Sequence, residues 1–351
     1  MNTTQVDAIA NAVLYEGYML YPYRPSSVKN RQRFNFGVLY SKPYSDAQSG
    51  SDAWSLQTEC LIEGSAPVLD IKLRFLKLVD RSLRRGTDPE QDLSGTLTTP
   101  DPVSTINVGN VLVPWQEATE CEVNVPSYEV SRLVAVPLEW KFNFPAKEQT
   151  ENVCDATGVP CGLVVRRQEA VKGVVEVRAF GVSEGVFKVQ VRVKNLTGFT
   201  EDSPITRDVA LAQSLLSAHV LLGVEGGCFV SLLEPTEELR EYAAACKNVG
   251  VWPVLVGAEG GRDTMLASPI ILYDYPQIAP ESPGDLFDGT EIDEILALRI
   301  LTMTDAEKNE MRQADERSRK MLERTESLPM EHLMKLHGTL RELRPSTEEM
   351  P

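Results

Sequence analysis

The stretch from Val175 to Lys194 reads VEVRAFGVSEGVFKVQVRVK, and it decides the fold class. Apolar and polar residues alternate over Val175–Ala179 and again over Phe187–Lys194, which is the period of strands with one buried and one exposed face. The segment Gly181–Gly185 between them is rich in turn residues and favours an antiparallel hairpin. The sequence therefore predicts a β-hairpin within a β-rich region.

The residues before this hairpin show the same period. Strands are predicted at Phe34–Tyr40, Ser55–Ile62, Ile71–Phe75, Glu120–Val125 and Leu138–Phe144. A short helix over Val6–Leu14 opens the chain. Residues 1–200 are therefore predicted to form a β-sandwich or a strongly bent sheet.

After residue 205 the period of the apolar residues becomes helical. We expect a helix capped by Thr206, with an apolar face formed by Val209, Ala212, Leu215, Leu216, His219 and Val220. A buried strand at Cys228–Leu233, a helix at Thr236–Lys247 and a buried strand at Val251–Val256 follow as a βαβ-like unit, with a third strand at Ser268–Tyr273. Residues 201–286 are thus predicted as a small α/β layer, possibly continuous with the first region.

Residues 287–351 are predicted to be helical. Thr290–Leu301 is followed by a helix with the capping box Thr304–Glu307 and an apolar stripe formed by Met311, Ala314, Ser318 and Met321, and then by a last helix over Leu328–Leu343. The amphipathic stripes fit two arrangements, in which the helices pack on the chain's own body or present Met and Leu to another protein. The predicted fold class is α+β, with a helical C-terminal extension.

Composition limits the classes of partner. The 351 residues include 51 acidic and 35 basic residues, which gives a formal net charge of −16. Such a chain repels phosphate backbones and anionic lipid unless its basic residues are gathered in a patch, so nucleic acid is not an expected partner. The sequence has no apolar run of about 18 residues and no secretory signal pattern. We expect a cytoplasmic protein without a membrane span.

The chain lacks the sequence patterns of common catalytic and metal sites. None of the six cysteines forms a CxxC pair, the glycine loops match no phosphate-binding fingerprint, and the three histidines accompany no GxSxG motif. Cys154 and Cys161 bracket a loop, either as a disulfide or ligand pair or as two separate thiols. No catalytic residue and no metal ligand is predicted, and the cofactor is left open.

The segment Glu16–Arg33 is the first candidate for recognition. It concentrates three of the ten tyrosines and four basic residues in a stretch too rich in Pro and Ser for a regular element. Arginine binds carboxylates in a forked geometry and tyrosine supplies rigid contact area, so this composition suits a binding surface. An ordered connection whose tyrosines pack on the sheet is the alternative. The candidate binding residues are Glu16, Tyr18, Tyr21, Tyr23, Arg24, Lys29, Asn30 and Arg33.

The segment Tyr273–Glu294 is the second candidate, and it is rich in proline and carboxylates. Its spacing fails the EF-hand pattern, so a metal site has little support. Acids near a helix start also favour the helix dipole, which explains some of them without a ligand. Docking of this acidic segment on the first, basic segment would join the two ends of the chain. The candidate residues are Asp274, Tyr275, Glu281, Asp285, Asp288, Glu291 and Glu294.

Both segments carry a resemblance to a known family. The strings LYEGYMLYPYR at Leu14–Arg24, with Ser27, Lys29, Asn30 and Arg33, and SPIILYD at Ser268–Asp274, continued by PESPGDLFDGTEIDE at Pro280–Glu294, resemble uncharacterised bacterial proteins associated with [NiFe]-hydrogenase gene clusters. The likeness runs from about residue 10 to residue 338. It implies an accessory or maturation protein that holds a hydrogenase subunit or another maturation protein.

Three hypotheses about function follow. The first is an accessory protein of hydrogenase maturation or assembly that binds a partner through the two segments. The second is an enzyme with a carboxylate-lined site at the strand ends of the α/β layer, using Asp274, Glu281 or Asp285 as acid or base. The third is a structural subunit that docks in a larger complex through its C-terminal helices.

Overall fold

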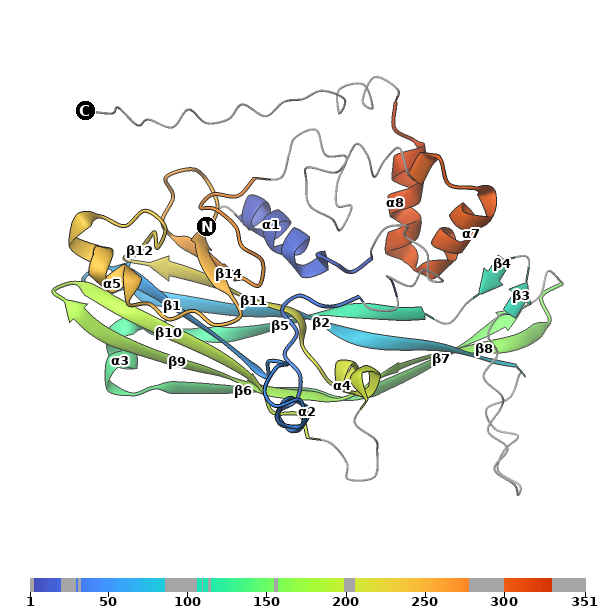
Figure 1. Cartoon of the computed structure of the whole chain (residues 1–351), viewed down its shortest axis with the longest axis horizontal. Helices are drawn as coiled ribbons and strands as arrows, with labels where there is room; N and C mark the ends of the chain where they lie inside the picture. Colours follow the sequence, from blue (N-terminus) through green and yellow to red (C-terminus); the bar gives the residue numbers. More distant parts are fainter. Residues whose placement is uncertain are drawn as a thin grey trace.

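Two antiparallel β-sheets packed face to face form the body of the protein (Figure 1). The computed structural model describes residues 3–19, 30, 33–85, 106–108, 110–112, 115–154, 157–198, 206–277 and 300–329. The predicted α+β class, with a β-rich body and C-terminal helices, is confirmed. No helix in these residues is long and apolar enough to cross a membrane.

The predicted hairpin lies inside the smaller sheet. Strands β9 (Val171–Ser183) and β10 (Val186–Asn195) pair antiparallel with Val177 opposite Val191. The five-stranded sheet has the order β12-β1-β10-β9-β6, in which β1 spans Ser55–Glu63, β6 spans Leu138–Phe144 and β12 spans Cys228–Val230. Every pairing in this sheet is antiparallel.

The larger sheet is built around the long strand β2 (Val68–Arg85). One edge of β2 pairs with β5 (Trp115–Glu129), and further pairs connect it to β11 (Leu216–Glu225) and β8 (Pro160–Gln168). The remaining strands of this seven-stranded sheet are β7 (Lys147–Cys154), β13 (Trp252–Leu255) and β14 (Thr264–Ser268). A separate ribbon pairs β3 (Ile106–Val108) with β4 (Asn110–Leu112).

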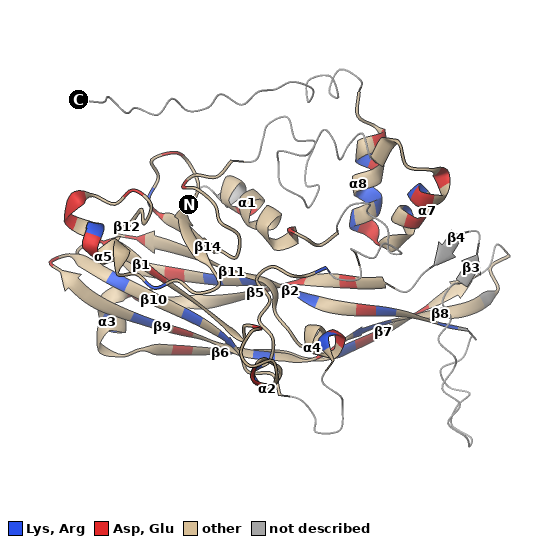
Figure 2. Cartoon of the chain, in the orientation of Figure 1, with Lys and Arg blue, Asp and Glu red and all other residues tan. Residues whose placement is uncertain are grey.

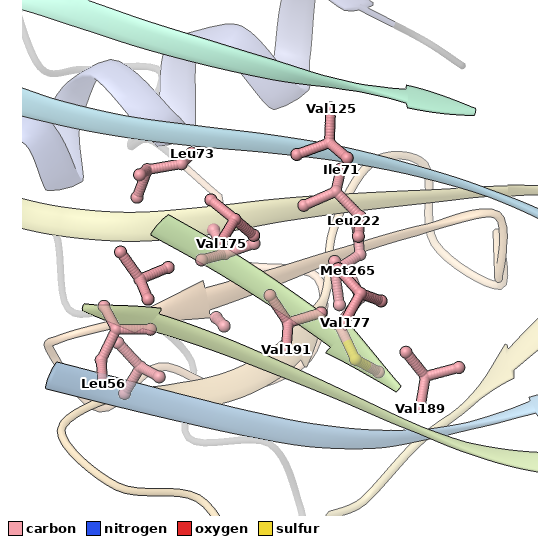
Figure 3. Packing of buried hydrophobic residues seen from close by; sticks show 14 of the residues in the cluster. Leu56, Ile71, Leu73, Val125, Val175, Val177, Val189, Val191, Leu222 and Met265 are labelled. Carbon is pink, nitrogen blue, oxygen red and sulfur yellow. The ribbon is translucent and has the colours of Figure 1, made fainter. Parts of the chain in front are cut away.

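The main core fills the space between the two sheets, where branched aliphatic side chains interdigitate (Figure 3). Val175, Val177, Val189 and Val191 supply it from the five-stranded sheet, and each is fully buried. Their partners from the larger sheet include Ile71, Leu73, Val125, Leu222 and Met265. The alternation seen in the sequence follows from this arrangement, because the intervening residues of β9 and β10 face outward.

Helices cover the opposite face of the larger sheet and make a second core with it (Figure 1). These helices are α1 (Thr3–Tyr15), α7 (Asp305–Ala314) and α8 (Glu316–Glu326). Shorter helical turns complete the described chain: α2 (Lys42–Ala47), α3 (Val130–Ala135), α4 (Arg207–Ala212), the 3-10 turn η3 (Glu237–Leu239) and α5 (Arg240–Ala244). The helices α1, α7 and α8 therefore thicken one side of the sandwich, while η3 and α5 pack on the outward Leu61 of β1 in the other sheet.

Several predicted elements are confirmed. The helix at Val6–Leu14 lies within α1, and the strands predicted at Ser55–Ile62 and Leu138–Phe144 match β1 and β6. Thr304 and Glu307 form the predicted capping box, with the Thr304 hydroxyl accepting from the Glu307 N–H and the Glu307 carboxylate accepting from the Thr304 N–H.

The predicted helix after Thr206 is too long. Thr206 does cap α4, but the helix ends at Ala212, and Leu216–Glu225 forms strand β11. The reason is that β11 is buried on both faces, by the sandwich core and by α1, so its apolar residues do not alternate. A continuous apolar run of this kind also matches helical spacing.

The region from 228 to 273 is not a βαβ unit. Strand β12 joins the five-stranded sheet, whereas β13 and β14 pair antiparallel in the larger sheet. These strands extend the sheets built by the first 200 residues. Two further predicted strands differ from the structure. The strand predicted at Ser268–Tyr273 is β14 and lies at Thr264–Ser268. The segment Phe34–Tyr40 forms no strand and contributes one isolated bridge, from Leu39 to Leu215.

The apolar stripe Met311–Met321 belongs to two helices, because the chain becomes extended at Asp315 between α7 and α8. Met311, Ala314, Ser318 and Met321 are all buried on the chain's own body, which is the first of the two arrangements considered for these helices. The helix predicted at Leu328–Leu343 lies almost wholly outside the described residues, as does most of Thr290–Leu301.

Candidate functional site

The described residues of the first recognition segment are mostly buried. Tyr18 and Arg33 are each 2% exposed and Asn30 is 3% exposed, so these side chains do not form a free surface. The expectation that they contact a partner directly is at odds with this burial, and the alternative of an ordered connection with packed tyrosines describes them. Glu16 is half-buried, and Tyr21, Tyr23, Arg24 and Lys29 lie outside the described residues.

Arg33 is enclosed by three aromatic rings. Its guanidinium carbon lies 3.6 Å from the centre of the Trp115 ring, 4.7 Å from that of Phe34 and 5.3 Å from that of Tyr18. The guanidinium also donates to the backbone oxygens of Tyr18 and Gln116. Burial lowers the pKa of Arg33 to about 10, while Tyr18 and Asp315 oppose the shift. Arg33 therefore stays charged at neutral pH, held by ring faces and carbonyl groups.

Asp315 links this aromatic cluster to the C-terminal helices. Its Oδ2 accepts from the Tyr18 hydroxyl at 2.8 Å and from the Trp115 indole N–H at 2.9 Å. Its Oδ1 caps α8 by accepting from the Ser318 N–H at 2.8 Å and the Ser318 hydroxyl at 2.9 Å. We call Tyr18, Arg33, Trp115 and Asp315 the Asp315 junction.

The Asp315 junction joins the N-terminal segment to the C-terminal helices, although Asp315 is not the predicted acidic partner. Burial raises the pKa of the Tyr18 phenol, and the Asp315 charge adds to the shift, so Tyr18 remains a neutral donor. Tyr15 makes a parallel contact, in which its hydroxyl donates to Glu120 and its ring lies 3.6 Å below the Arg317 guanidinium carbon. The two ends of the described chain are thus held together by aromatic and charged groups.

An open groove lies beside the Asp315 junction, between α7–α8 and strands β2, β5 and β8. Its volume is about 700 Å³. Three acidic residues, Glu117, Asp315 and Glu316, line it together with twice as many basic ones. The basic lining residues are Arg81, Arg166, Arg312, Arg317, Arg319 and Lys320. We call this site the basic groove, and Figure 2 shows the interleaved charges along α8.

The floor of the basic groove holds two arginines that share one carboxylate. Arg81 Nη1 lies 3.0 Å from Glu117 Oε1, and Arg166 Nε lies 3.1 Å from Glu117 Oε2. Burial lowers the pKa of Arg81, and the Glu117 charge opposes this shift. A second bond from Arg81, to the backbone oxygen of Gln313 at 3.1 Å, ties the groove floor to the end of α7. The floor is therefore rigid and carries more positive than negative charge.

The rim of the basic groove is looser. Arg319 pairs with Glu323 at 3.9 Å and Lys320 pairs with Glu316 at 2.7 Å, and at least half of each side chain is exposed. Exposed ion pairs of this kind contribute only about 0–1 kcal/mol, so an incoming carboxylate can replace them. Three further carboxylates, of Glu120, Glu151 and Glu326, also pair with arginines of the groove. These pairs weaken the electric field at a distance, so the groove attracts a ligand carboxylate by direct contact.

In the second recognition segment, Asp274 has a structural role. Its Oδ1 accepts from the Leu255 N–H at 2.7 Å, and its Oδ2 accepts from the Ser231 hydroxyl. Tyr275 follows with a φ of 56°, and its ring packs at the edge of the main core. The other predicted residues, Glu281, Asp285, Asp288, Glu291 and Glu294, lie outside the described residues.

The remaining titratable groups do not gather into a metal site in the described part of the chain, where no three His, Cys, Asp or Glu side chains are placed to hold an ion. His219 is fully buried, and burial lowers its pKa to about 4. Cys154 and Cys161 are free thiols on the neighbouring strands β7 and β8, and Cys161 donates to the Val153 oxygen.

Sequence reasoning missed the basic groove. The run RSRK at Arg317–Lys320 indicates a basic cluster on the exposed side of a helix. The prediction for this helix rests on its apolar stripe alone. Arg81 and Arg166 carried no signal, because a charged residue on a strand usually faces solvent.

Comparison of the chain with models of known protein families gives no match, and comparison with curated protein sequences gives none either. The geometry of the basic groove and the resemblance of the two segments therefore carry the functional proposal.

Proposed function

We propose that the chain is an accessory protein that acts by binding another protein, and that the basic groove receives a carboxylate-bearing segment of this partner. The observation that carries the proposal is the gathering of six basic side chains around one open groove in a chain of net charge −16. Five of the six are arginines, whose planar guanidinium groups bind carboxylates through two parallel hydrogen bonds.

The groove is built in two parts that suit stepwise binding. Arg166 is fixed by Glu117 and its side chain is 30% exposed, so it offers a preset position for a carboxylate at little cost in side-chain entropy. Arg81, whose side chain is 6% exposed, holds Glu117 from the other side. Arg319 and Lys320 lie at the rim in weak pairs and can turn toward the ligand. A segment with two or more carboxylates would use both parts.

The proposal extends to the predicted recognition residues between Met19 and Asn30. Tyr18, just before this stretch, lines the groove and contacts Arg33 just after it. Tyr21, Tyr23, Arg24 and Lys29 lie outside the described residues and remain proposed contacts of the partner. The buried residues Tyr18 and Arg33 act as supports for this surface.

The resemblance to proteins of [NiFe]-hydrogenase gene clusters supplies the proposed pathway. In that proposal the partner is a hydrogenase subunit or another maturation protein, and the complex forms in the cytoplasm during maturation or assembly. A binding role of this kind calls for a stable body that presents a charged site, and the rigid groove floor meets that requirement.

The test is capture of the partner from the native host. The tagged protein is purified under hydrogenase-inducing conditions, with mass spectrometry of the co-purifying proteins and elemental analysis of the same sample. We expect hydrogenase subunits or maturation proteins to be recovered, and we expect the double variant R319E/K320E to lose them.

The matched control is the double variant R132E/R240E. Arg132 and Arg240 make the same kind of short-range surface pair on helices away from the groove, and the change in net charge is identical. Equal recovery with both variants would contradict the proposal. A solitary protein that carries a stoichiometric metal or small molecule would favour the enzyme hypothesis instead.

A further inference from the structure

The outer face of the five-stranded sheet is a second basic surface. Along β10, the outward residues Lys188, Arg192 and Lys194 alternate with core valines, and Lys172 and Arg178 point outward from β9. Lys141 on the edge strand β6 adds a sixth cation. We call these six residues and their face the basic face. The acids that point outward from the strands of this sheet are Glu59, Glu63, Glu139 and Glu176, so the six cations exceed the carboxylates by two.

Three of the six cations form no ion pair within the described residues, and the other three do. Lys188 pairs with Glu59 at 3.4 Å, and Arg192 and Lys194 both pair with Glu176. Lys141, Lys172 and Arg178 are exposed and form no ion pair within the described residues. In a chain with 16 more acidic than basic residues, exposed cations gathered on one face form a local positive surface that attracts carboxylates.

Two lysines flank a buried valine at one end of the basic face. Val174 points outward from β9, yet it is only 4% exposed, and its direct cross-strand neighbours are Lys141 and Lys194. Lysine lays its methylene stem along apolar surface while the ammonium group stays in water, and Val174 offers such a surface to both lysines.

Apolar contact area borders the cations. Phe180 is 41% exposed beside Lys188, whose ammonium nitrogen lies 5.4 Å from the ring centre, and Leu196 is 47% exposed after the end of β10. A flat surface that combines basic residues with exposed apolar side chains is typical of a protein interface.

The pattern of charges decides the class of ligand. Glu139 lies directly opposite Glu176 in the β6–β9 pair, so two carboxylates interrupt the cations. A uniform polyanion such as nucleic acid would bring phosphates against these carboxylates. An acidic protein surface can place its carboxylates on the cations and a basic side chain opposite Glu139.

We propose that the basic face is a docking surface for an acidic protein segment of mixed charge, distinct from the ligand of the basic groove. The groove lies among α7, α8 and the larger sheet, whereas the basic face is the outer face of the five-stranded sheet, on the opposite side of the sandwich (Figure 1). Both surfaces can therefore be occupied together, and the protein then acts as a bridge between two acidic segments.

The experiment uses fluorescence anisotropy at low salt, with the full chain and three labelled probes. The probes are a 16-residue Glu/Gly peptide with one central Lys, the same peptide with Glu in place of that Lys, and a 16-nucleotide single-stranded DNA. To isolate the face from the groove, all measurements use the R319E/K320E background. We expect the peptide with the central Lys to bind tightest and the DNA to bind weakest.

The decisive variant is K141E/K172E/R178E. It reverses the charge of the three cations of the basic face that form no ion pair within the described residues. We expect it to weaken binding of the Lys-containing peptide at least about tenfold and to acquire binding of a charge-reversed Lys/Gly peptide with a central Glu. The control K42E/R132E/R240E carries the same change in net charge at exposed, ion-paired positions elsewhere, and we expect nearly unchanged binding.

Three results would overturn the proposal: an equal loss with the control variant, DNA binding as tight as peptide binding, or the absence of peptide binding to the parent protein. Matching circular dichroism spectra and thermal midpoints of the two triple variants exclude misfolding as the cause of a loss. The outcome is distinguishable from a failure of the proposed groove function, because K141E/K172E/R178E changes no residue that lines the groove.

Discussion

Replacement of Asp315 by Ala should remove a large part of the protein's stability. The change deletes the cap of α8, which contributes about 1 kcal/mol, and two hydrogen bonds from Tyr18 and Trp115 to a charged acceptor, which contribute about 1.5–3 kcal/mol each. Because Asp315 is only half-buried, we place the expected loss near the lower end of the combined range, at about 4 kcal/mol. Domains typically have about 5–15 kcal/mol in total.

The measurement is equilibrium denaturation in guanidinium chloride, followed by tryptophan fluorescence and by circular dichroism. Trp115 lies in the Asp315 junction, so its emission reports the local change directly. Asp315→Asn keeps a good cap residue but offers one acceptor oxygen in place of two, and we expect an intermediate loss of about 2 kcal/mol.

Asp305→Ala is the matched control, since Asp305 lies in the first turn of α7 and acts through the helix dipole, worth about 0.3–1 kcal/mol. A loss of less than 1 kcal/mol for Asp315→Ala, in a protein with an unchanged spectrum, would refute the reasoning that the Asp315 junction holds the C-terminal helices on the body.

The remaining predictions concern the core, one histidine and the thiols. Gly173→Ala should destabilise the protein by about 1–3 kcal/mol, because its Cβ would overlap the Phe142 ring, whereas Gly181→Ala on the same strand meets no atom within 4 Å and should be nearly neutral in the same denaturation assay. The pKa of His219 is about 4 in the folded protein and about 6.5 in the unfolded chain, so the folded state binds the proton more weakly. The stability that neutral His219 contributes is therefore complete above pH 6.5 and is lost as the pH falls toward 4. His219→Gln should therefore reduce the stability difference between pH 7 and pH 4 by about 3 kcal/mol, and an unchanged pH dependence would contradict the assignment. Cys154 is exposed and should react with a thiol reagent at pH 8 much faster than Cys60, whose pKa is raised by burial; mass spectrometry of the modified peptides measures the order, and equal rates would refute it.

The strands that sequence reasoning placed well have one buried and one exposed face. Strand β10 alternates between core valines and outward basic or amide side chains, and β6 was predicted at its observed bounds. Strand β11 was assigned to a helix because both of its faces are covered, which removes the alternation. Periodicity therefore finds a strand at the surface of a sandwich and fails where a second layer lies on top of it.

The site was harder to predict because its parts are far apart in the sequence. Tyr18 and Asp315 are 297 residues apart, and neither carries a local signal of the other. The concentration of tyrosine and arginine near the N-terminus did mark this region, but the same residues suit a buried junction as well as an exposed surface. Composition cannot distinguish the two, because an arginine enclosed by rings and carbonyl groups needs the same residue types as one that meets a partner.

The Asp315 junction also has a consequence for the order of events during synthesis. Arg33 and Trp115 leave the ribosome early, but the carboxylate that completes their cluster is 200 residues behind Trp115. Until residues 300–329 emerge, the helix-bearing face of the larger sheet lacks α7 and α8, and the apolar side chains of Leu76 and Leu78 lack their full cover. One wall of the basic groove is formed by residues of α7 and α8 from Arg312 to Lys320, so a chain that ends before residue 300 lacks this wall. Binding of the proposed partner at the groove therefore requires these C-terminal helices.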